Sequence, residues 1–358
     1  MPKASSLLHV AAEKAWTNKA LFLSLALGVG LIVAVAWMAR PVAILARMGA
    51  LGATGIAALL LNFGLGFSCG VEGWRALLRA HGVRSSFSSA FGIMSGGYAL
   101  GYLIPSCYLA GEPVRVLLAS RRFSAQGHEI MATIVLEKVL FAATVAALLV
   151  GAGVVGLRSG LPPVLHQGVL SFAGAAVLMV GATLVGVTRR TPWASSCLAL
   201  VRRFLPRWAF LEWGNRTLFK IEGDLRKALS GRRGAVANAA GFITLSVWLN
   251  ALAPFIFFAF AYGRILSLEE LALFFTLSTM FSLFSWLTPG AVGIAEGAYA
   301  GIFGIMGLPI DGALAFALVQ RVASLSIVVL GLLYLGRQGV DGFGKGKIEH
   351  GGAEPNLR

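Results

Sequence analysis

Charged residues are scarce in this chain. They make up 13% of its 358 residues, whereas a soluble domain usually carries about a quarter. This scarcity excludes an ordinary soluble domain. The 57% of hydrophobic residues and the mean hydropathy of +0.80 indicate an all-α integral membrane protein that crosses the bilayer several times. The formal charge is nevertheless +15. In a membrane protein such an excess indicates cytoplasmic loops beside anionic lipid, so we expect no nucleic-acid partner.

Signals for metals, nucleotides and disulfides are also missing. The three cysteines, Cys69, Cys107 and Cys197, have no paired spacing, and the five histidines are scattered along the chain. The sequence contains no Walker loop for ATP. We therefore expect no cofactor, no metal site and no catalytic residue.

Apolar runs of about 20 residues, the length that crosses a bilayer, recur along the chain. They predict six spans, at about 20–39, 50–71, 130–157, 168–188, 235–262 and 312–335. Two more apolar segments, 87–120 and 268–307, are broken at Pro105 and Pro289. Basic residues flank both ends of 87–120, so we expect this segment to be a re-entrant hairpin that enters and leaves on one face. The second broken segment is interpreted in the same way.

The distribution of basic residues predicts the orientation. Residues 1–19, the loops beside the first hairpin and the segment 189–234 are rich in Lys and Arg, which places both termini in the cytoplasm. The segment 189–234 has eleven Lys or Arg against three Asp or Glu. Two interpretations of it stay open: an amphipathic helix on an anionic leaflet, or a linker helix packed on the protein. Residues 336–358 form a basic, glycine-rich tail that we expect to be disordered.

One offset of 184 residues relates the two broken segments. It separates Pro105 from Pro289, Glu112 from Glu296, and Glu137 from Arg321. We therefore predict two copies of one membrane unit, at 20–157 and 168–335. Each copy has three crossings and one hairpin. Because that number of crossings is odd, the second copy is expected to be inverted, as in many secondary transporters.

Charges inside the apolar runs are the candidate functional residues. Glu137 and Arg321 are expected about 10 Å and about 14 Å deep in their spans, where a charge costs several kcal/mol unless it is paired or wetted. We predict that they pair with each other, either around a polar cavity at the repeat interface or as a structural ion pair. Glu112 and Arg115, three positions apart on a helix, share a face. They form either a headgroup site or a surface pair.

Glycines in the second hairpin have two predicted roles. Gly290 after Pro289 frees backbone groups at a hairpin tip, and these need substrate, water or Glu296 as a partner. Gly293, Gly297 and Gly301 recur every fourth residue, a pattern typical of close helix packing.

Four short stretches resemble a known family: 111–115 (Gly-Glu-Pro-Val-Arg), 135–138 (Val-Leu-Glu-Lys), 289–296 (Pro-Gly-Ala-Val-Gly-Ile-Ala-Glu) and 320–321 (Gln-Arg). They resemble the membrane region of lysylphosphatidylglycerol synthases and the flippase-like membrane proteins in which that region occurs alone. In the multiple peptide resistance factor this region moves aminoacylated phospholipid between leaflets, and a separate soluble domain makes that lipid. That domain is not seen here, so lysyl transfer is not expected. Some stand-alone relatives are linked to hopanoid biosynthesis.

The resemblance implies a lipid flippase in the cytoplasmic (inner) membrane of a bacterium. Its substrate would be an anionic or aminoacylated phospholipid, or an isoprenoid or hopanoid lipid. The expected transport residues are Glu112, Arg115, Glu137, Pro289, Gly290, Glu296 and Arg321. Two alternatives stay open: a membrane anchor for a lipid-modifying enzyme, acting through 189–234, and an embedded enzyme that uses Glu112 and Glu296.

Overall fold

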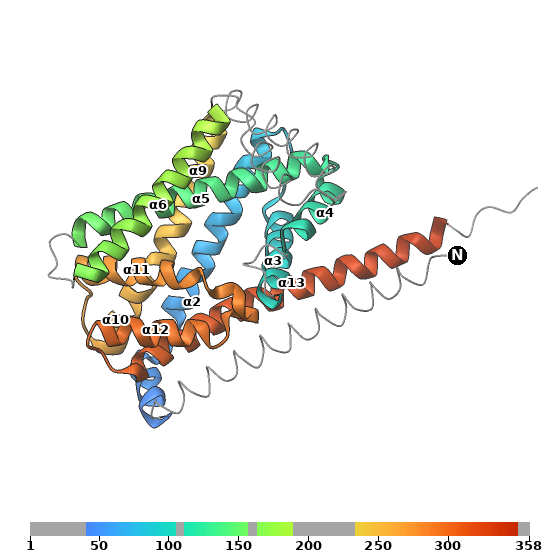
Figure 1. Cartoon of the computed structure of the whole chain (residues 1–358). Coiled ribbons are helices and arrows are strands. Elements are labelled where there is room, and N and C mark those ends of the chain that lie inside the picture. The colour runs from blue at the N-terminus through green and yellow to red at the C-terminus, as the bar shows by residue number, and fades with distance from the viewer. Residues whose placement is uncertain (1–40, 105–110, 157–162, 189–232, 350–358) are drawn as a thin grey trace, which may run out of the picture.

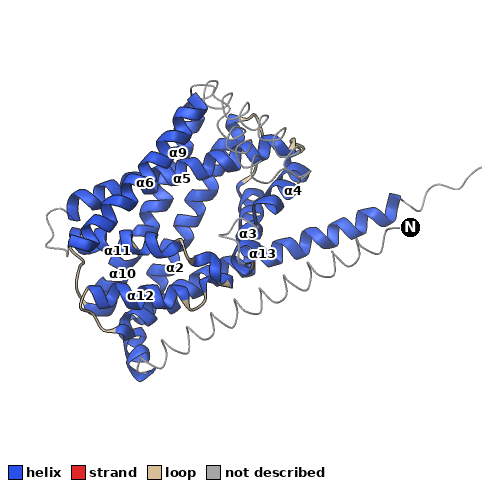
Figure 2. Cartoon of the chain, viewed as in Figure 1, coloured by secondary structure: helices blue, strands red, loops and turns tan. Residues whose placement is uncertain are grey.

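The computed structural model describes residues 41–104, 111–156, 163–188 and 233–349. Within these ranges every regular element is a helix and no strand occurs (Figure 2). The predicted first span, the tip of the first hairpin and most of the segment 189–234 lie outside the described residues. The all-helical prediction is confirmed for the part of the chain that the structure describes.

Long and short helices follow one another along the described chain (Figure 1). Their bounds are α2 Pro41–Ala80, α3 Phe87–Leu103, α4 Glu112–Phe123, α5 Gly127–Gly156, α6 Pro163–Thr188, α9 Arg233–Ala251, α10 Ala253–Tyr262, α11 Leu268–Ser282, α12 Ile294–Ile305 and α13 Ile310–Glu349, with short 3-10 turns η2 Ser285–Leu287 and η3 Pro289–Ala291 between α11 and α12.

Four helical stretches of the described chain are long and apolar enough to cross a membrane: Ile44–Ala80, Gly127–Val155, Arg233–Tyr262 and Ile310–Gln338. They contain the predicted second, third, fifth and sixth spans, in whole or nearly so. Helix α6 covers the predicted fourth span and is not among these four. The chain is thus a multi-pass membrane protein.

Proline and glycine interrupt the second half where the sequence predicts a break. Pro289 begins a single 3-10 turn, because its ring cannot donate a helical hydrogen bond. Gly290 and Gly293 then adopt φ values of 60° and 81°, a left-handed region that glycine enters without steric cost. Helix α12 starts directly after this turn, at Ile294. The chain therefore reverses inside an otherwise apolar segment and exposes backbone groups there.

The order of elements repeats with the 184-residue offset. Adding 184 to the bounds of α4 gives 296–307, against 294–305 for α12. The same sum carries α3 to 271–287, α5 to 311–340 and α2 to 225–264, close to α11, α13 and α9–α10. The packing repeats too: α3 contacts α13 as α11 contacts α5, and α2 contacts α13 as α9 contacts α5. Each half thus packs its hairpin against the last long helix of the other half.

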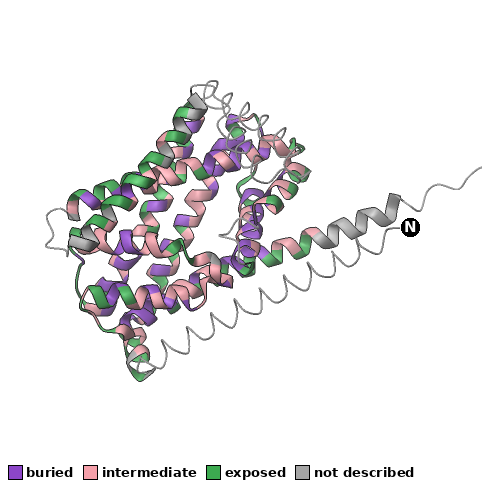
Figure 3. Cartoon of the chain, viewed as in Figure 1, coloured by how far each residue is buried: buried purple, intermediate pink, exposed green. Residues whose placement is uncertain are grey.

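Buried side chains lie where these helices cross (Figure 3). The larger core joins α2, α10, α11, α12 and α13 through stacked and edge-on aromatic rings, with Phe257 and Phe316 centroids 5.2 Å apart. Many large apolar side chains face outward on the spans, including Leu61, Phe141 and Leu333. A soluble monomer rarely exposes so much apolar surface, so this surface fits contact with lipid chains.

Two sequence expectations differ from the structure. Helix α13 continues to Glu349, into the tail predicted to be disordered from 336, because extending a formed helix costs far less than starting one. Figure 1 shows this end of α13 leaving the bundle. A Cβ added at Gly297 or Gly301 would meet no described residue within 4 Å, so these two glycines mediate no close packing within the part of the chain that the structure describes.

Two short glycine patterns in the sequence lie in helix interiors. GxSxG occurs at 66–70 within α2, and GxGxxG occurs at 151–156 at the end of α5. The chemistry of either motif requires a strand, a tight turn and a helix. Neither pattern has that context, so neither forms a nucleophile elbow or a dinucleotide loop.

Candidate functional site: two buried ionic centres

The first ionic centre consists of Glu112, Arg115, Glu137 and Lys138. Helix α4 begins at Glu112, and Arg115 follows one turn later, so the two side chains meet as the spacing predicts, with Nη1 donating to Oε2 over 2.9 Å. The second nitrogen, Nη2, donates to Glu137 Oε2 on α5 over 2.5 Å. Lys138 Nζ lies 2.8 Å from the other oxygen of Glu112. Two cations and two carboxylates thus form one closed network between α4 and α5.

Burial makes this network strong and costly to disturb. Arg115 is 3% exposed and Glu137 is 7% exposed. The guanidinium carbon of Arg115 lies 4.5 Å from the ring centre of Trp74, a cation–π contact. The indole of Trp74 in turn donates to Thr133 over 3.0 Å. The Nη1 and Nη2 atoms of Arg115 are paired, and its buried Nε has no hydrogen-bond partner among the described residues. Charges removed from water need such pairing, since each one otherwise costs several kcal/mol.

Two glycines allow α3 and α4 to approach closely beside Arg115. A Cβ at Gly97 on α3 would overlap Cγ of Arg115, and a Cβ at Gly111 would overlap the backbone of Gly97. Any larger residue at either position would push the helices apart. The position of the guanidinium therefore depends on the absence of these two side chains.

A cavity of about 480 Å³ opens beside the first centre. All four ionic residues line it, and Lys138 has a side chain that is 49% exposed. The remaining wall comes from α2, α3, α5 and α9, with side chains that include Tyr98, Phe141 and Ser246. The cavity thus offers one accessible ammonium group next to a fully enclosed guanidinium.

The second ionic centre consists of Glu296, Arg321, Tyr102 and the carbonyl of Gly290. Glu296 lies in the first turn of α12, and its Oε2 accepts the Gly293 N–H over 2.8 Å. Its Oε1 accepts from Arg321 Nε over 2.9 Å and from Arg321 Nη2 over 2.5 Å. Glu296 therefore caps the new helix through Gly293 and also binds the cation, whereas the carbonyl freed at Gly290 accepts from Arg321, a partner that the sequence did not suggest.

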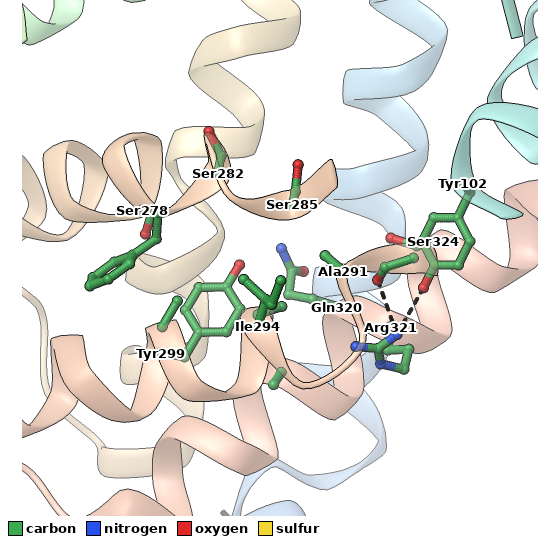
Figure 4. A pocket seen from close by; sticks show the side chains of 15 residues that line it. Tyr102, Ser278, Ser282, Ser285, Ala291, Ile294, Tyr299, Gln320, Arg321 and Ser324 are labelled. Carbon is green, nitrogen blue, oxygen red and sulfur yellow. Dashed lines mark hydrogen bonds between the residues drawn. The ribbon is translucent and has the colours of Figure 1, made fainter. Parts of the chain in front are cut away.

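Arg321 also reaches across to the first half of the chain. Its Nη1 donates to the hydroxyl of Tyr102 on α3 over 3.1 Å and to the carbonyl of Gly290 over 3.2 Å. Figure 4 shows both bonds as dashed lines. The ring of Tyr102 packs on the hairpin turn, since a Cβ at Gly290 would lie 2.6 Å from one of its ring carbons. The guanidinium group of Arg321 thus makes four hydrogen bonds within the protein.

A cavity of about 230 Å³ lies beside the second centre. Serines Ser278, Ser282 and Ser285 succeed one another along one wall, and Gln320 lies between Tyr299 and Arg321 in the close view (Figure 4). This cavity is lined mainly by small and hydroxyl-bearing side chains of α11, α12 and α13.

The predicted pairing of Glu137 with Arg321 is wrong. Glu137 binds Arg115, and Arg321 binds Glu296, so each charge is paired inside its own half. Sequence spacing gives the depth of a residue along a helix, but it does not give the direction that its side chain faces around the bundle. The partners are set by packing, because α4 lies against α5 and α12 lies against α13.

Other residues at these centres were not singled out from the sequence. Trp74 and Tyr102 carry no local signal, because each becomes relevant only through long-range packing. Lys138 could have been found, since it follows Glu137 directly in one of the family-like stretches. Pro289 supplies no polar side chain and contributes through the hairpin turn alone. Within the described ranges, no group of three His, Cys, Asp or Glu side chains gathers as a metal site.

The spans, the broken hairpin and the buried ionic centres define a multi-pass helical membrane protein with polar cavities inside its bundle. The chain belongs to the family of the lysylphosphatidylglycerol synthase transmembrane region, whose family model matches residues 21–331. No significant match was found among curated proteins or among solved structures. The family membership supports a role connected with membrane lipids.

Proposed function

We propose that this protein moves a lipid between the leaflets of a bacterial inner membrane, with both termini in the cytoplasm. The observation that carries the proposal is that each half holds an ion pair at a hairpin, deep in the bundle and beside a cavity. Glu137 lies ten positions after Gly127, about 15 Å along α5, and Arg321 lies eleven positions after Ile310, about 17 Å along α13. In a hydrocarbon core of about 30 Å both are near the middle.

An inverted repeat would give these two sites access from opposite sides. The shared 184-residue offset and the reciprocal packing of the hairpins support two copies of one unit. The crossings by α2, α5 and α6 precede α9, so α2 and α9–α10 would run in opposite directions. Inverted repeats with sites near the midplane are the usual architecture for alternating access.

The headgroup would exchange partners with the ionic centres as it passes. At the first centre Lys138 is accessible and would meet a phosphate, while Arg115 stays between Glu112 and Glu137. The carboxylates neutralise the cations when no lipid is present, which keeps the empty site from holding an unpaired charge. Apolar lipid chains would remain on the outer face of the helices. The substrate proposed is an anionic or aminoacylated phospholipid, with isoprenoid or hopanoid lipids as the next class. Because the two acidic candidates for catalysis, Glu112 and Glu296, are each bound to an arginine, we propose transport rather than catalysis.

Lipid translocation in proteoliposomes tests the proposal. Headgroup-labelled phosphatidylglycerol would be followed with the parent protein, with Arg321→Gln, and with Arg84→Gln as a control on an exposed arginine outside both centres. We expect protein-dependent translocation that Arg321→Gln lowers at least tenfold and Arg84→Gln leaves unchanged. Equal translocation by the parent and Arg321→Gln would assign that residue to structure alone. If no phospholipid moved, isoprenoid and hopanoid lipids would be tested next. Failure with these as well would leave the anchoring of a lipid-modifying enzyme.

A further inference from the structure

The cavity beside the second ionic centre has little free positive charge to offer. Arg321 is its cation, and three of its nitrogens already donate to Glu296, Tyr102 and Gly290. A guanidinium has five N–H donors, so four hydrogen bonds leave one donor. With Glu296 as counter-ion, the pair carries no net charge. A phosphate would have to displace a carboxylate that also caps α12.

Hydrogen-bonding capacity, in contrast, is left over. Ser278 Oγ and Gln320 Oε1 are buried atoms that have no hydrogen-bond partner among the described residues, and both residues line this cavity. A buried polar atom without a partner is unfavourable, so a group that bonds to these atoms gains binding affinity. Gln320 Oε1 is an acceptor only, and a fully ionised phosphate has no hydrogen to donate to it.

Further hydroxyl groups surround these two atoms. Ser282, Ser285 and Ser324 also line the cavity, in addition to Tyr299 on the opposite wall. Figure 4 shows Gln320 in the middle of this group. Hydroxyls both donate and accept, so the lining matches a ligand whose own groups do the same.

We propose that this cavity binds an uncharged, hydroxyl-rich headgroup, such as a sugar ring or a small polyol, by hydrogen bonds to Ser278 and Gln320. The inference rests on the proposed lipid transport for the source of the ligand, and it names the headgroup chemistry. It separates the two centres by task. The cavity with Lys138 meets charge, and the cavity with Gln320 meets hydroxyl groups.

Binding of short-chain lipids to the full-length protein in detergent tests this inference. The probes share dioctanoylglycerol tails: monoglucosyl-dioctanoylglycerol, dioctanoyl phosphatidic acid, and dioctanoylglycerol with no added headgroup. The variants are Gln320→Leu and Ser278→Ala. Ser326→Ala is the control, because its hydroxyl bonds to the Ala323 carbonyl of its own helix over 2.7 Å and lies outside the cavity. Dissociation constants come from calorimetry, and thermal unfolding of each variant shows that it is folded.

We expect the glucosyl lipid to bind more tightly than dioctanoylglycerol, and phosphatidic acid to bind at the Lys138 cavity with an affinity that Gln320→Leu leaves unchanged. Gln320→Leu should weaken the binding of the glucosyl lipid about tenfold, and Ser278→Ala should weaken it less, whereas Ser326→Ala should not change it. The inference is overturned if Gln320→Leu weakens the binding of phosphatidic acid as much as that of the glucosyl lipid, or if the folded Gln320→Leu variant binds the glucosyl lipid as the parent does. Binding of the glucosyl lipid without its translocation would overturn the proposed transport and leave this site standing. Translocation of phospholipid without glucosyl-lipid binding would do the reverse.

Discussion

The two ionic centres occupy equivalent places in the two halves, yet their charges are exchanged. In the first half the arginine is on the hairpin helix α4 and its carboxylate, Glu137, is on the following span. In the second half the carboxylate, Glu296, is on the hairpin helix α12 and the arginine is on the span. The offset of 184 residues carries Arg115 onto Tyr299 and Glu137 onto Arg321. What the halves share is a hairpin carboxylate, Glu112 or Glu296, that binds a cation on the following span, Lys138 or Arg321.

The centres differ in how firmly the cation is enclosed. The side chain of Arg115 is 4% exposed and lies between two carboxylates and an indole ring, whereas the side chain of Arg321 is 18% exposed and has one carboxylate. The two centres therefore differ in how completely their arginine is enclosed. The first centre resembles a fixed structural network with one accessible lysine. The second centre has one carboxylate and is more exposed.

Replacing each arginine by methionine should break the comparison most visibly. Arg115→Met leaves Glu112 and Glu137 without their shared partner, and we expect it to lower the free energy of unfolding by about 3–5 kcal/mol. Arg321→Met should cost clearly less, because only Glu296 loses its partner and the site is partly open. Thermal unfolding of both variants in detergent measures the difference, with the exposed Arg84→Met as the control. A larger loss for Arg321→Met would contradict the ranking.

Adding one methyl group beside Arg115 tests how tightly the first centre is packed. Gly97→Ala places a Cβ on the arginine side chain, so we expect a loss of about 1–3 kcal/mol in the free energy of unfolding. Gly151→Ala is the matched control in another helix, because its Cβ meets nothing within 4 Å. Both substitutions gain the same helix propensity, and the difference between their unfolding temperatures isolates the overlap. Equal temperatures would show that the centre yields without cost.

The exposed ion pair between Arg264 and Glu270, at the start of α11, should have the smallest effect on stability. Burial acts to raise the pKa of Glu270, but hydrogen bonds from the Ser267 N–H and from Arg264 outweigh it and hold the pKa below the ordinary value of 4.5. A carboxyl group with a lowered pKa stabilises the fold above that ordinary value, and the contribution is lost as the pH falls through the folded-state pKa.

Glu270→Gln should therefore lower the free energy of unfolding by less than about 1 kcal/mol at pH 7. The difference from the parent should shrink as the pH falls below 4.5. Unfolding temperatures across this pH range, with the exposed neighbour Glu269→Gln as reference, check the effect. A difference that grows on acidification would reverse the assigned sign.

The sequence was sufficient for the class and for the position of the break at Pro289, whereas the break predicted at Pro105 lies outside the described residues. Few charges and long apolar runs predict helices in lipid, and Pro289 with Gly290 predicts a broken limb, because both are local properties of the chain. Partner choice was not accessible in the same way. Glu137 and Arg321 were placed at similar depth, but their true partners, Arg115 and Glu296, were decided by the direction of side chains around the bundle. The role of Tyr102 could not be predicted for the same reason, since its partner Arg321 is 219 positions away in the sequence.

The hydrogen bond between Tyr102 and Arg321 couples the two halves of the chain. Helix α3 belongs to the hairpin of the first half, and α13 is the last long helix of the second. If α3 slides along α13, the Tyr102 hydroxyl moves away from the guanidinium, and Arg321 then loses one of its hydrogen-bond acceptors. That shift changes the balance at Glu296 and hence at the first turn of α12. A movement of α3 in the first half would thus change the electrostatics around Arg321 in the second half, through the hydroxyl group of Tyr102.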